Sequence, residues 1–446
     1  MGRAQQTVST HSRSGLDKAM QRVKMHASRN RWVGNNNRYR EDCIGSLKQD
    51  LKAGRLNHRH LADYIAASAP LHCADGWSYL GRALQAHSNG DSATSLHLAY
   101  YAELRATMSL LACEGIGVFN RQHFRVDQNG KCLVQPVKTT HEFAKDALVS
   151  WSDDPIALKL LETVVMPGGI SLERWLTGYT KLKAAWQPTA RDIFRMWGVD
   201  LDVIREDKEA RNEASYRPSQ INVASSMAAN DASAFLRQVW DVVSPLPASR
   251  FDILDKHFLR HLSEKAFEIL EEGTAASAQP RYETWVNSMI GTVLGSDSES
   301  DLKRFLLRTD HPEDLKIIEY ARTKAANGAE PAPHICVTSR ALLLLRIATG
   351  ACSNLLVRAA IGRNEIRFWW APWGIGRGLW EDGNEPSSFV DLWADVEEAI
   401  RSLESWENTN ASSRRPGSYA ALKREVSEEI MILGSCERIP LWGLGL

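Results

Sequence analysis

The feature that most constrains the fold is the longest apolar stretch of the chain, ICVTSRALLLLRIATGACSNLLVRAAIG, at residues 335–362. Its length alone would suffice for a helix that spans a membrane. Three arginines interrupt it, however, at Arg340, Arg346 and Arg358, so the stretch predicts a buried helix over 335–360 and no membrane span. A chain of 446 residues is long enough to bury such a helix in a sizeable core without disulfide bonds.

Helical periodicity also dominates the rest of the chain, which predicts a mainly α fold with two helical-bundle domains. One β-hairpin insertion is expected near 122–136, because Asn129-Gly130 separates two alternating runs in HFRVDQNGKCLVQP. A second extended segment is expected at NEIRFWWAP, residues 364–372. The other helices are predicted at 41–53, 57–69, 76–88, 92–115, 139–150, 154–165, 170–184, 188–198, 200–214, 230–243, 250–271, 281–294, 312–326, 387–405 and 417–432.

Charge is unevenly distributed along a chain whose formal net charge is zero. Residues 1–60 contain thirteen Lys and Arg against four Asp and Glu, so the remainder is acidic by the same amount. We predict a basic, flexible arm at 1–40, a helical domain at 41–245, and a second helical domain at 246–446 that is rich in tryptophan near 367–393. The arm is interpreted either as a solvated terminus or as a segment that follows nucleic-acid phosphates.

Cysteine and histidine usage argues against metal and cofactor sites. The seven cysteines lie far apart in the sequence and are odd in number, which is typical of reduced thiols in a cytoplasmic protein. His257 and His261 have a spacing compatible with a metal ion but lack the glutamate of the metalloprotease motif. The sequence also contains no phosphate loop of nucleotide hydrolases, no nucleophile elbow and no kinase signature. We therefore predict no metal and no cofactor.

A short polar motif, EARNEASYRPSQ at 209–220, lies at the end of a strongly charged predicted helix. Arg211 is followed at once by Asn212, and Tyr216 lies five residues after the arginine. This pattern resembles the HEPN family (higher eukaryotes and prokaryotes nucleotide-binding), whose signature is Arg, a polar residue and then a His. The earlier segment SATSLHLAYYAELRATMSLLACEGIGVFN, residues 92–120, is similar to the long second helix of those bundles. The resemblance covers at most residues 70–245.

The resemblance implies a helical bundle that cuts RNA without metal at a dimer seam, in a prokaryotic defence or toxin-type system. In that chemistry the 2′-hydroxyl attacks the adjacent phosphate, an arginine stabilises charge on the phosphoryl oxygens, and a histidine transfers a proton. Here Arg211 and Asn212 match the motif, whereas Tyr216 stands where the family has histidine. A tyrosine with a reference pKa of about 10 is a poor base at neutral pH. This departure leaves phosphate binding open and puts catalysis in question.

A second cluster is expected on one face of the predicted helix 92–115. His97, Tyr101 and Arg105 are spaced four residues apart, and an imidazole, a phenol and a guanidinium on one line suit a phosphate pocket. A polar edge of a packed helix would have the same spacing. If this helix lies beside Arg211, His97 could supply the missing base, and Tyr101 and Arg105 could bind phosphate.

A tryptophan-rich stretch in the second predicted domain suggests a contact surface for a protein partner. Trp373, Arg377 and Trp380 lie within RFWWAPWGIGRGLWEDG, and Trp and Arg are enriched at interface anchors. An aromatic core plug and a surface on which nucleic-acid bases stack are the alternative interpretations. Two functions therefore remain open for the chain. One is cleavage of RNA, rather than DNA, by a metal-independent endoribonuclease with a HEPN-like site. The other is a non-catalytic scaffold in a multi-protein antiphage complex. A protein partner or a homodimer is expected for the chain.

Overall fold

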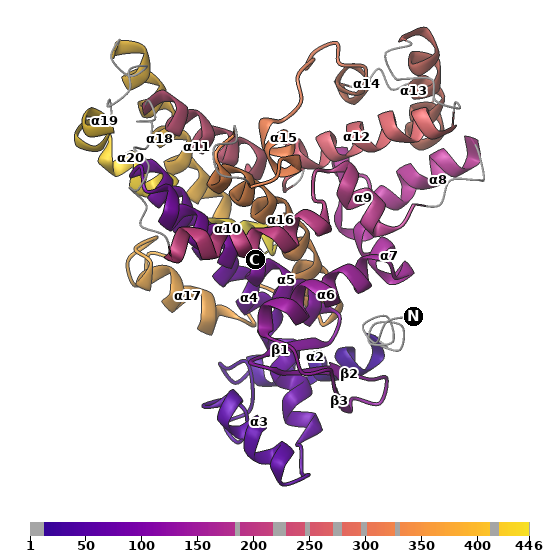
Figure 1. The fold of residues 1–446 in the computed structure, drawn as a ribbon, viewed down its shortest axis with the longest axis vertical. Coiled ribbons are helices and arrows are strands. Elements are labelled where there is room, and N and C mark those ends of the chain that lie inside the picture. The colour runs from indigo at the N-terminus through magenta and orange to yellow at the C-terminus, as the bar shows by residue number, and fades with distance from the viewer. Residues whose placement is uncertain are drawn as a thin grey trace.

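The computed structural model describes residues 13–182, 188–216, 229–245, 250–270, 279–295, 301–325, 331–410 and 419–445. Its fold is mainly α with one small antiparallel sheet, which confirms the predicted mainly α class with a β-hairpin insertion (Figure 1). The helices, in chain order, are α2 (Arg13–Ala27), α3 (Cys43–Lys52), α4 (His58–Ser88), α5 (Ser92–Cys113), α6 (Thr140–Ser152), α7 (Pro155–Val164), η1 (Pro167–Gly169), α8 (Leu172–Leu182), α9 (Ala190–Met196), α10 (Leu201–Tyr216), α11 (Ala229–Val243), α12 (Asp252–Leu270), α13 (Gln279–Leu294), α14 (Asp301–Leu306), α15 (Lys316–Arg322), α16 (Pro333–Arg358), α17 (Arg367–Gly376), η2 (Phe389–Asp391), α18 (Leu392–Thr409), α19 (Tyr419–Glu425), α20 (Ser427–Leu433), η3 (Cys436–Arg438) and α21 (Ile439–Gly443).

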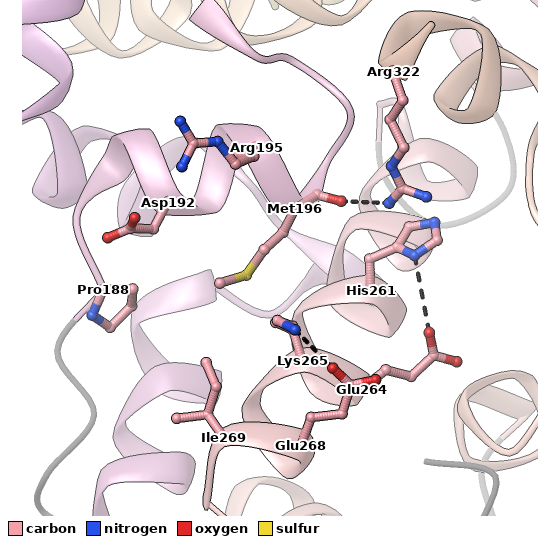
Figure 2. A pocket seen from close by; sticks show the side chains of 10 residues that line it. All are labelled: Pro188, Asp192, Arg195, Met196, His261, Glu264, Lys265, Glu268, Ile269 and Arg322. Atoms are coloured by element: carbon pink, nitrogen blue, oxygen red, sulfur yellow. Dashed lines mark hydrogen bonds and ion pairs between the residues drawn. The ribbon is translucent and has the colours of Figure 1, made fainter. Parts of the chain in front are cut away.

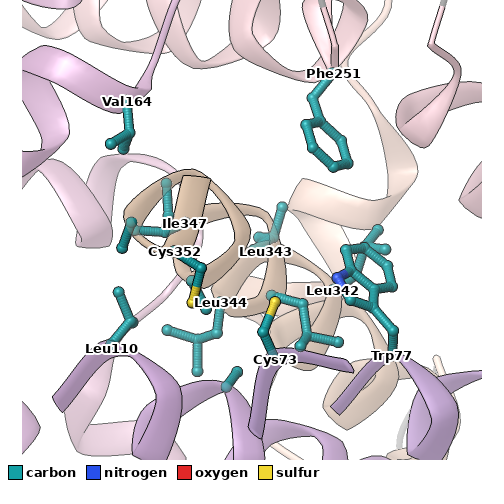
Figure 3. Packing of buried hydrophobic residues seen from close by; sticks show 14 of the residues in the cluster. Cys73, Trp77, Leu110, Val164, Phe251, Leu342, Leu343, Leu344, Ile347 and Cys352 are labelled. Carbon is teal, nitrogen blue, oxygen red and sulfur yellow. The ribbon is translucent and has the colours of Figure 1, made fainter. Parts of the chain in front are cut away.

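The apolar helix α16 forms the centre of the core, where it packs against α4 and α5. Figure 3 shows Cys73 and Trp77 of α4 and Leu110 of α5 beside its leucines. The Trp77 indole N–H donates to the Thr349 hydroxyl at 2.9 Å, so a polar group of α16 is satisfied inside the core. Among the described residues, α16 is the one helix long and apolar enough to cross a membrane, and 89% of its apolar window is buried within the protein. The predicted core helix is therefore confirmed.

The arginines that interrupt the apolar stretch fix α16 to other segments. Arg346 is bound by the Asp255 carboxylate at 2.6 and 2.9 Å, and Arg340 is bound by Asp207 at 2.6 and 2.8 Å. Both carboxylates are fully buried, and each forms an ion pair with its arginine inside the core, as burial of a charge requires. Arg358, at the exposed end of the helix, pairs with Asp17 of α2.

Helix α4 differs from the sequence prediction, which placed two helices at 57–69 and 76–88. It is a single helix of 31 residues that runs through Pro70. Proline removes one backbone hydrogen bond and favours a break. The helix continues here because the side chains around Pro70, among them Ala66, Ala69 and Cys73, are buried in the core.

The sheet contains the predicted hairpin and one further strand. Strands β1 (Ile116–Phe119), β2 (Gln122–Val126) and β3 (Cys132–Val134) pair in that order, with Phe124 opposite both Gly117 and Val134. The Asn129-Gly130 turn joins β2 to β3, as predicted. Gly130 has a φ of 82°, and its N–H donates to the Asp127 carbonyl at 3.0 Å.

Residues 13–40, which the sequence analysis assigned to a flexible basic arm, are packed against the rest of the protein. Residues 1–12 lie outside the described part of the chain. Helix α2 packs against α4 and buries one apolar face that includes Leu16 and Val23. Its basic residues pair with acids of later segments, at 2.6 Å for Arg22 and Asp63 and at 3.0 Å for Arg13 and Glu114. Two of the surplus positive charges of the terminus are thus neutralised by acids of the bundle.

The predicted division at residue 245 is not reflected in the packing of the described residues, whose main hydrophobic core extends from α2 to the last turn, beside a smaller cluster around Tyr100. The Trp240 indole donates to the Leu433 carbonyl at 2.8 Å, and the Trp442 indole donates to the Val243 carbonyl at 3.2 Å. Gly81 of α4 lies so close to the C-terminal segment that an added Cβ would stand 2.3 Å from the Gly434 carbonyl oxygen. The last elements therefore pack back onto the first half of the chain.

Candidate phosphate-binding site

Arg211 lies against α5, the helix that carries the second cluster singled out in the sequence. Its guanidinium carbon is 4.9 Å from the ring centre of Tyr100 and 5.8 Å from that of Tyr101. The arginine forms no ion pair with a described carboxylate, and its buried Nε has no hydrogen-bond partner in the described part of the chain. We call Arg211, Tyr100, Tyr101, His97 and His141 the Arg211 cluster.

A buried charge network positions α10 on α5. Asp207, one turn before Arg211, binds Arg340 of α16, and both side chains are fully buried. Lys145 of α6 donates to the Ile204 carbonyl of α10 and lies 3.9 Å from the Glu103 carboxylate of α5. Burial and the nearby Asp207 raise the pKa of Glu103 well above its usual range. Four helices thus meet in one polar network directly behind the Arg211 cluster.

His97 lies next to Tyr101 and faces the end of α10. Its Nδ1 is 2.9 Å from the Ser215 hydroxyl, and its ring centre is 5.1 Å from that of Tyr101. Burial, followed by the charge of Arg211, lowers the pKa of His97. The imidazole is therefore neutral at neutral pH, and one of its ring nitrogens can accept a proton.

His141 completes the cluster, although the sequence analysis did not select it. Its Nδ1 is 2.8 Å from the Tyr100 hydroxyl, and its ring centre is 6.2 Å from that of Tyr101. Burial and the charge of Arg211 lower the pKa of His141 to about 4. The sequence does locate it at the start of the helix predicted over 139–150, and in the structure Thr139 and Glu142 form a capping box there. Only the packing of α6 on α5 shows which residues it meets.

Arg105 turns away from the rest of the predicted phosphate line. One of its guanidinium nitrogens is 2.8 Å from His72 Nδ1 and 3.6 Å from the Asp75 carboxylate, both on α4. Because four residues exceed one helical turn by about 40°, the line from His97 to Arg105 rotates by about 80° around α5. Burial and the charge of Arg105 lower the pKa of His72 to about 3. Arg105 therefore faces α4, whereas Tyr101 faces Arg211.

The two remaining motif residues contribute little to the cluster geometry. Asn212 is half-buried, and its amide makes no hydrogen bond to the described residues. Tyr216 is the last residue of α10 and is 82% exposed. Its ring makes no contact with another ring of the described chain, so it does not occupy the place of a second catalytic group beside Arg211.

The tryptophan-rich segment is helical and lies largely in the core. The expected extended segment at 364–372 is wrong, because Arg367–Gly376 form α17 and bury Trp370 against Phe389 at 5.1 Å between ring centres. Trp380 is only 9% exposed and covers Gly374, so it cannot anchor a partner from the surface as the sequence suggested. Trp373 is half-buried and stacks on Trp369, whereas Arg377 is exposed and binds Glu437 at 3.2 Å.

The His257 and His261 pair belongs to a structural network. Arg260 lies between the two histidines in the sequence and is fully buried. It donates to the His311 and Glu313 carbonyls at 2.6 Å each. Burial and the charge of Arg260 lower the pKa of His257 to about 2. No group of three metal-binding side chains occurs in the described ranges of the chain.

A pocket of about 640 Å³ lies away from the Arg211 cluster, between α9, α12 and α15. Figure 2 shows that its charged side chains already contact one another, with Lys265 bound to Glu268 at 2.8 Å. Arg322 donates to the Met196 carbonyl at 2.6 Å, and Arg195 pairs with Asp200 at 3.4 Å. Its lining contains as many carboxylates as Lys and Arg side chains, so the charge favours no anionic ligand.

Comparison with known proteins gives no relative: no family model, no curated protein and no solved structure matches this chain.

Proposed function

We propose that the protein binds RNA through the Arg211 cluster and cleaves it without a metal ion. The observation that carries the proposal is a guanidinium without a carboxylate partner among the described residues, held over two tyrosine rings and flanked by two histidines whose pKa values are lowered. Arginine binds phosphate oxygens through a rigid fork of N–H groups, and its hydrogen bonds to an anion are strong.

The neutral histidines suit proton transfer at an RNA phosphate. In the proposed reaction His97 takes the proton of a 2′-hydroxyl, whose oxygen attacks the adjacent phosphorus. The bond from phosphorus to the 5′-oxygen breaks, the leaving oxygen takes up a proton from solvent water, and a 2′,3′-cyclic phosphate and a 5′-hydroxyl result, while His97 returns its proton to the solvent. Arg211 stabilises the negative charge that develops on the phosphoryl oxygens.

The HEPN-like resemblance places this activity in a prokaryotic antiphage or toxin-type setting in the cytoplasm. That setting is part of the proposal and rests on the motif around Arg211 alone. The exposed position of Tyr216 favours the alternative function, a non-catalytic scaffold that retains phosphate binding or a protein contact without cleavage. The two functions differ in one measurable product, the cyclic phosphate.

The proposal is tested with fluorescently labelled RNA in the presence of EDTA. We expect the wild-type protein to cut the RNA and leave 2′,3′-cyclic phosphate ends, and to spare a strand with 2′-deoxy sugars. His97→Ala should abolish cleavage while binding is retained. Arg211→Ala should weaken binding about tenfold and reduce the dependence on salt by about one counterion.

Arg205→Ala is the matched control on the same helix. Arg205 is half-exposed, pairs with Asp146 at 3.0 Å and contacts no ring of the cluster, so its loss should leave binding and cleavage unchanged. Binding without cleavage in EDTA and in Mg²⁺ would support the scaffold. Equal RNA binding by wild type and Arg211→Ala would refute the proposed site.

A further inference from the structure

We propose that the pocket beside Arg82, between α4, α17 and α20, takes a nucleobase of single-stranded RNA. This inference rests on the proposed function, because it identifies the strand that the Arg211 cluster would hold. The pocket is lined by Arg82, Gln85, Gly376, Arg377, Leu379, Met431, Gly434, Ser435 and Glu437.

A continuous stack of planar groups connects the Arg211 cluster to this pocket. Tyr101 of the cluster stacks on Tyr79 of α4, with ring centres 5.6 Å apart and planes inclined by 26°. The guanidinium carbon of Arg82 lies 4.4 Å from the ring centre of Tyr79. Arg82 is exposed, and it also lines the pocket. A base that enters the pocket therefore meets the guanidinium group of Arg82, which lies over Tyr79, and Tyr79 in turn stacks on Tyr101.

The size and the polar lining of the pocket suit a base. Its volume is about 260 Å³, slightly below the roughly 300–1,000 Å³ of pockets for drug-sized ligands. Glu437 is only 8% exposed and is held by Ser78 at 3.0 Å and by Arg377 at 3.2 Å through one carboxylate oxygen. The Gln85 amide makes no hydrogen bond to the described residues. Both groups can bond to the edge of a base.

The charge along the path from the cluster to the pocket favours a phosphate backbone. Four guanidinium groups lie along this path, those of Arg211, Arg105, Arg82 and Arg377. Two carboxylates oppose them, since Asp75 pairs with Arg105 and Glu437 pairs with Arg377. Proteins that bind single strands combine such a basic path with planar side chains on which bases stack. In a duplex the bases are paired inside the helix, so a single strand is the form that can fill the pocket.

The experiment compares a labelled, non-self-complementary RNA strand with its annealed duplex in fluorescence anisotropy. The informative variant is Arg82→Lys, which keeps the positive charge and removes the planar group. We expect it to bind the single strand about tenfold more weakly than wild type, with an unchanged salt dependence. Arg401→Lys is the matched control and should bind as wild type does, because Arg401 is exposed on α18 and its one ion pair within the described ranges is with Glu397.

Four outcomes decide the inference. Weaker single-strand binding by Arg82→Lys, together with poor duplex binding by wild type, supports the base site. Wild-type affinity of Arg82→Lys, or equal affinity of wild type for strand and duplex, overturns it. If Arg211→Ala alone weakens binding, the Arg211 site stands and the base site fails. If wild type binds no RNA, both fail.

Discussion

Asp207→Asn should be among the most damaging single changes in the chain, because it removes one charge of a fully buried ion pair. The Asp207 carboxylate accepts hydrogen bonds from Arg340 at 2.6 and 2.8 Å, and both side chains have no exposed surface. Asparagine keeps the shape of the side chain but leaves the guanidinium without its counter-charge. Breaking a buried pair in this way costs about 3–5 kcal/mol.

The structure places the expected cost near the lower end of that range. Arg340 also donates to the Ala321 and Thr323 carbonyls, at 2.9 and 2.7 Å, and these bonds survive the substitution. In addition, burial and, after it, the charge of Asp207 raise the pKa of Glu103, so removing Asp207 takes away the second of these causes and makes Glu103 easier to ionise, which compensates in part. We therefore expect a loss of about 3 kcal/mol in the free energy of unfolding.

Urea unfolding followed by circular dichroism measures this loss, with the neighbouring Glu206→Gln as control. Glu206 pairs with Lys324 at 2.8 Å, but both side chains are more than half exposed, so no measurable change is expected. The double variant Asp207→Asn/Glu103→Gln should lose more stability than the sum of the single variants, because the compensating carboxylate is gone. Equal stabilities of Asp207→Asn and Glu206→Gln would refute the reasoning.

Three further predictions concern pH and packing. Burial raises the pKa of Glu103, so the contribution of its protonated form to the free energy of unfolding is present at low pH and is lost as the pH rises above about 4.5. In urea titrations between pH 5 and 8, the free energy of unfolding of Glu103→Gln should therefore depend less on pH than that of wild type. Burial and a second histidine lower the pKa of His334 to about 3, so wild type should lose stability as the pH falls from 6.5, and His334→Gln should lose less over the same acid range of thermal melts. Gly374→Ala would place a Cβ 1.9 Å from the Trp380 ring and should cost about 1–3 kcal/mol in thermal unfolding, whereas Gly376→Ala, with open space around its Cβ, should not.

Local sequence signals located many of the elements that carry the candidate site. The cap at Asp91 begins α5, the capping box at Thr139 and Glu142 begins α6, and the Asn129-Gly130 pair forms the hairpin turn. Such signals work because their hydrogen bonds involve residues only a few positions apart. The same locality explains the failure at Pro70, where the sequence predicted a break and packing kept α4 continuous.

By itself the sequence determined that the chain is mainly helical, with a buried apolar helix at its centre and an arginine motif near its midpoint, since periodicity and caps are local properties. Only the tertiary structure decided which side chains meet that arginine. Tyr100 and His141, far apart in the chain, lie 2.8 Å from each other beside Arg211. Arg105 has the same four-residue spacing as His97 and Tyr101, but it faces α4 because residues at this spacing are offset around the helix axis. The packing of α4, α6 and α10 around α5 determines these contacts, and no local sequence pattern predicts this packing.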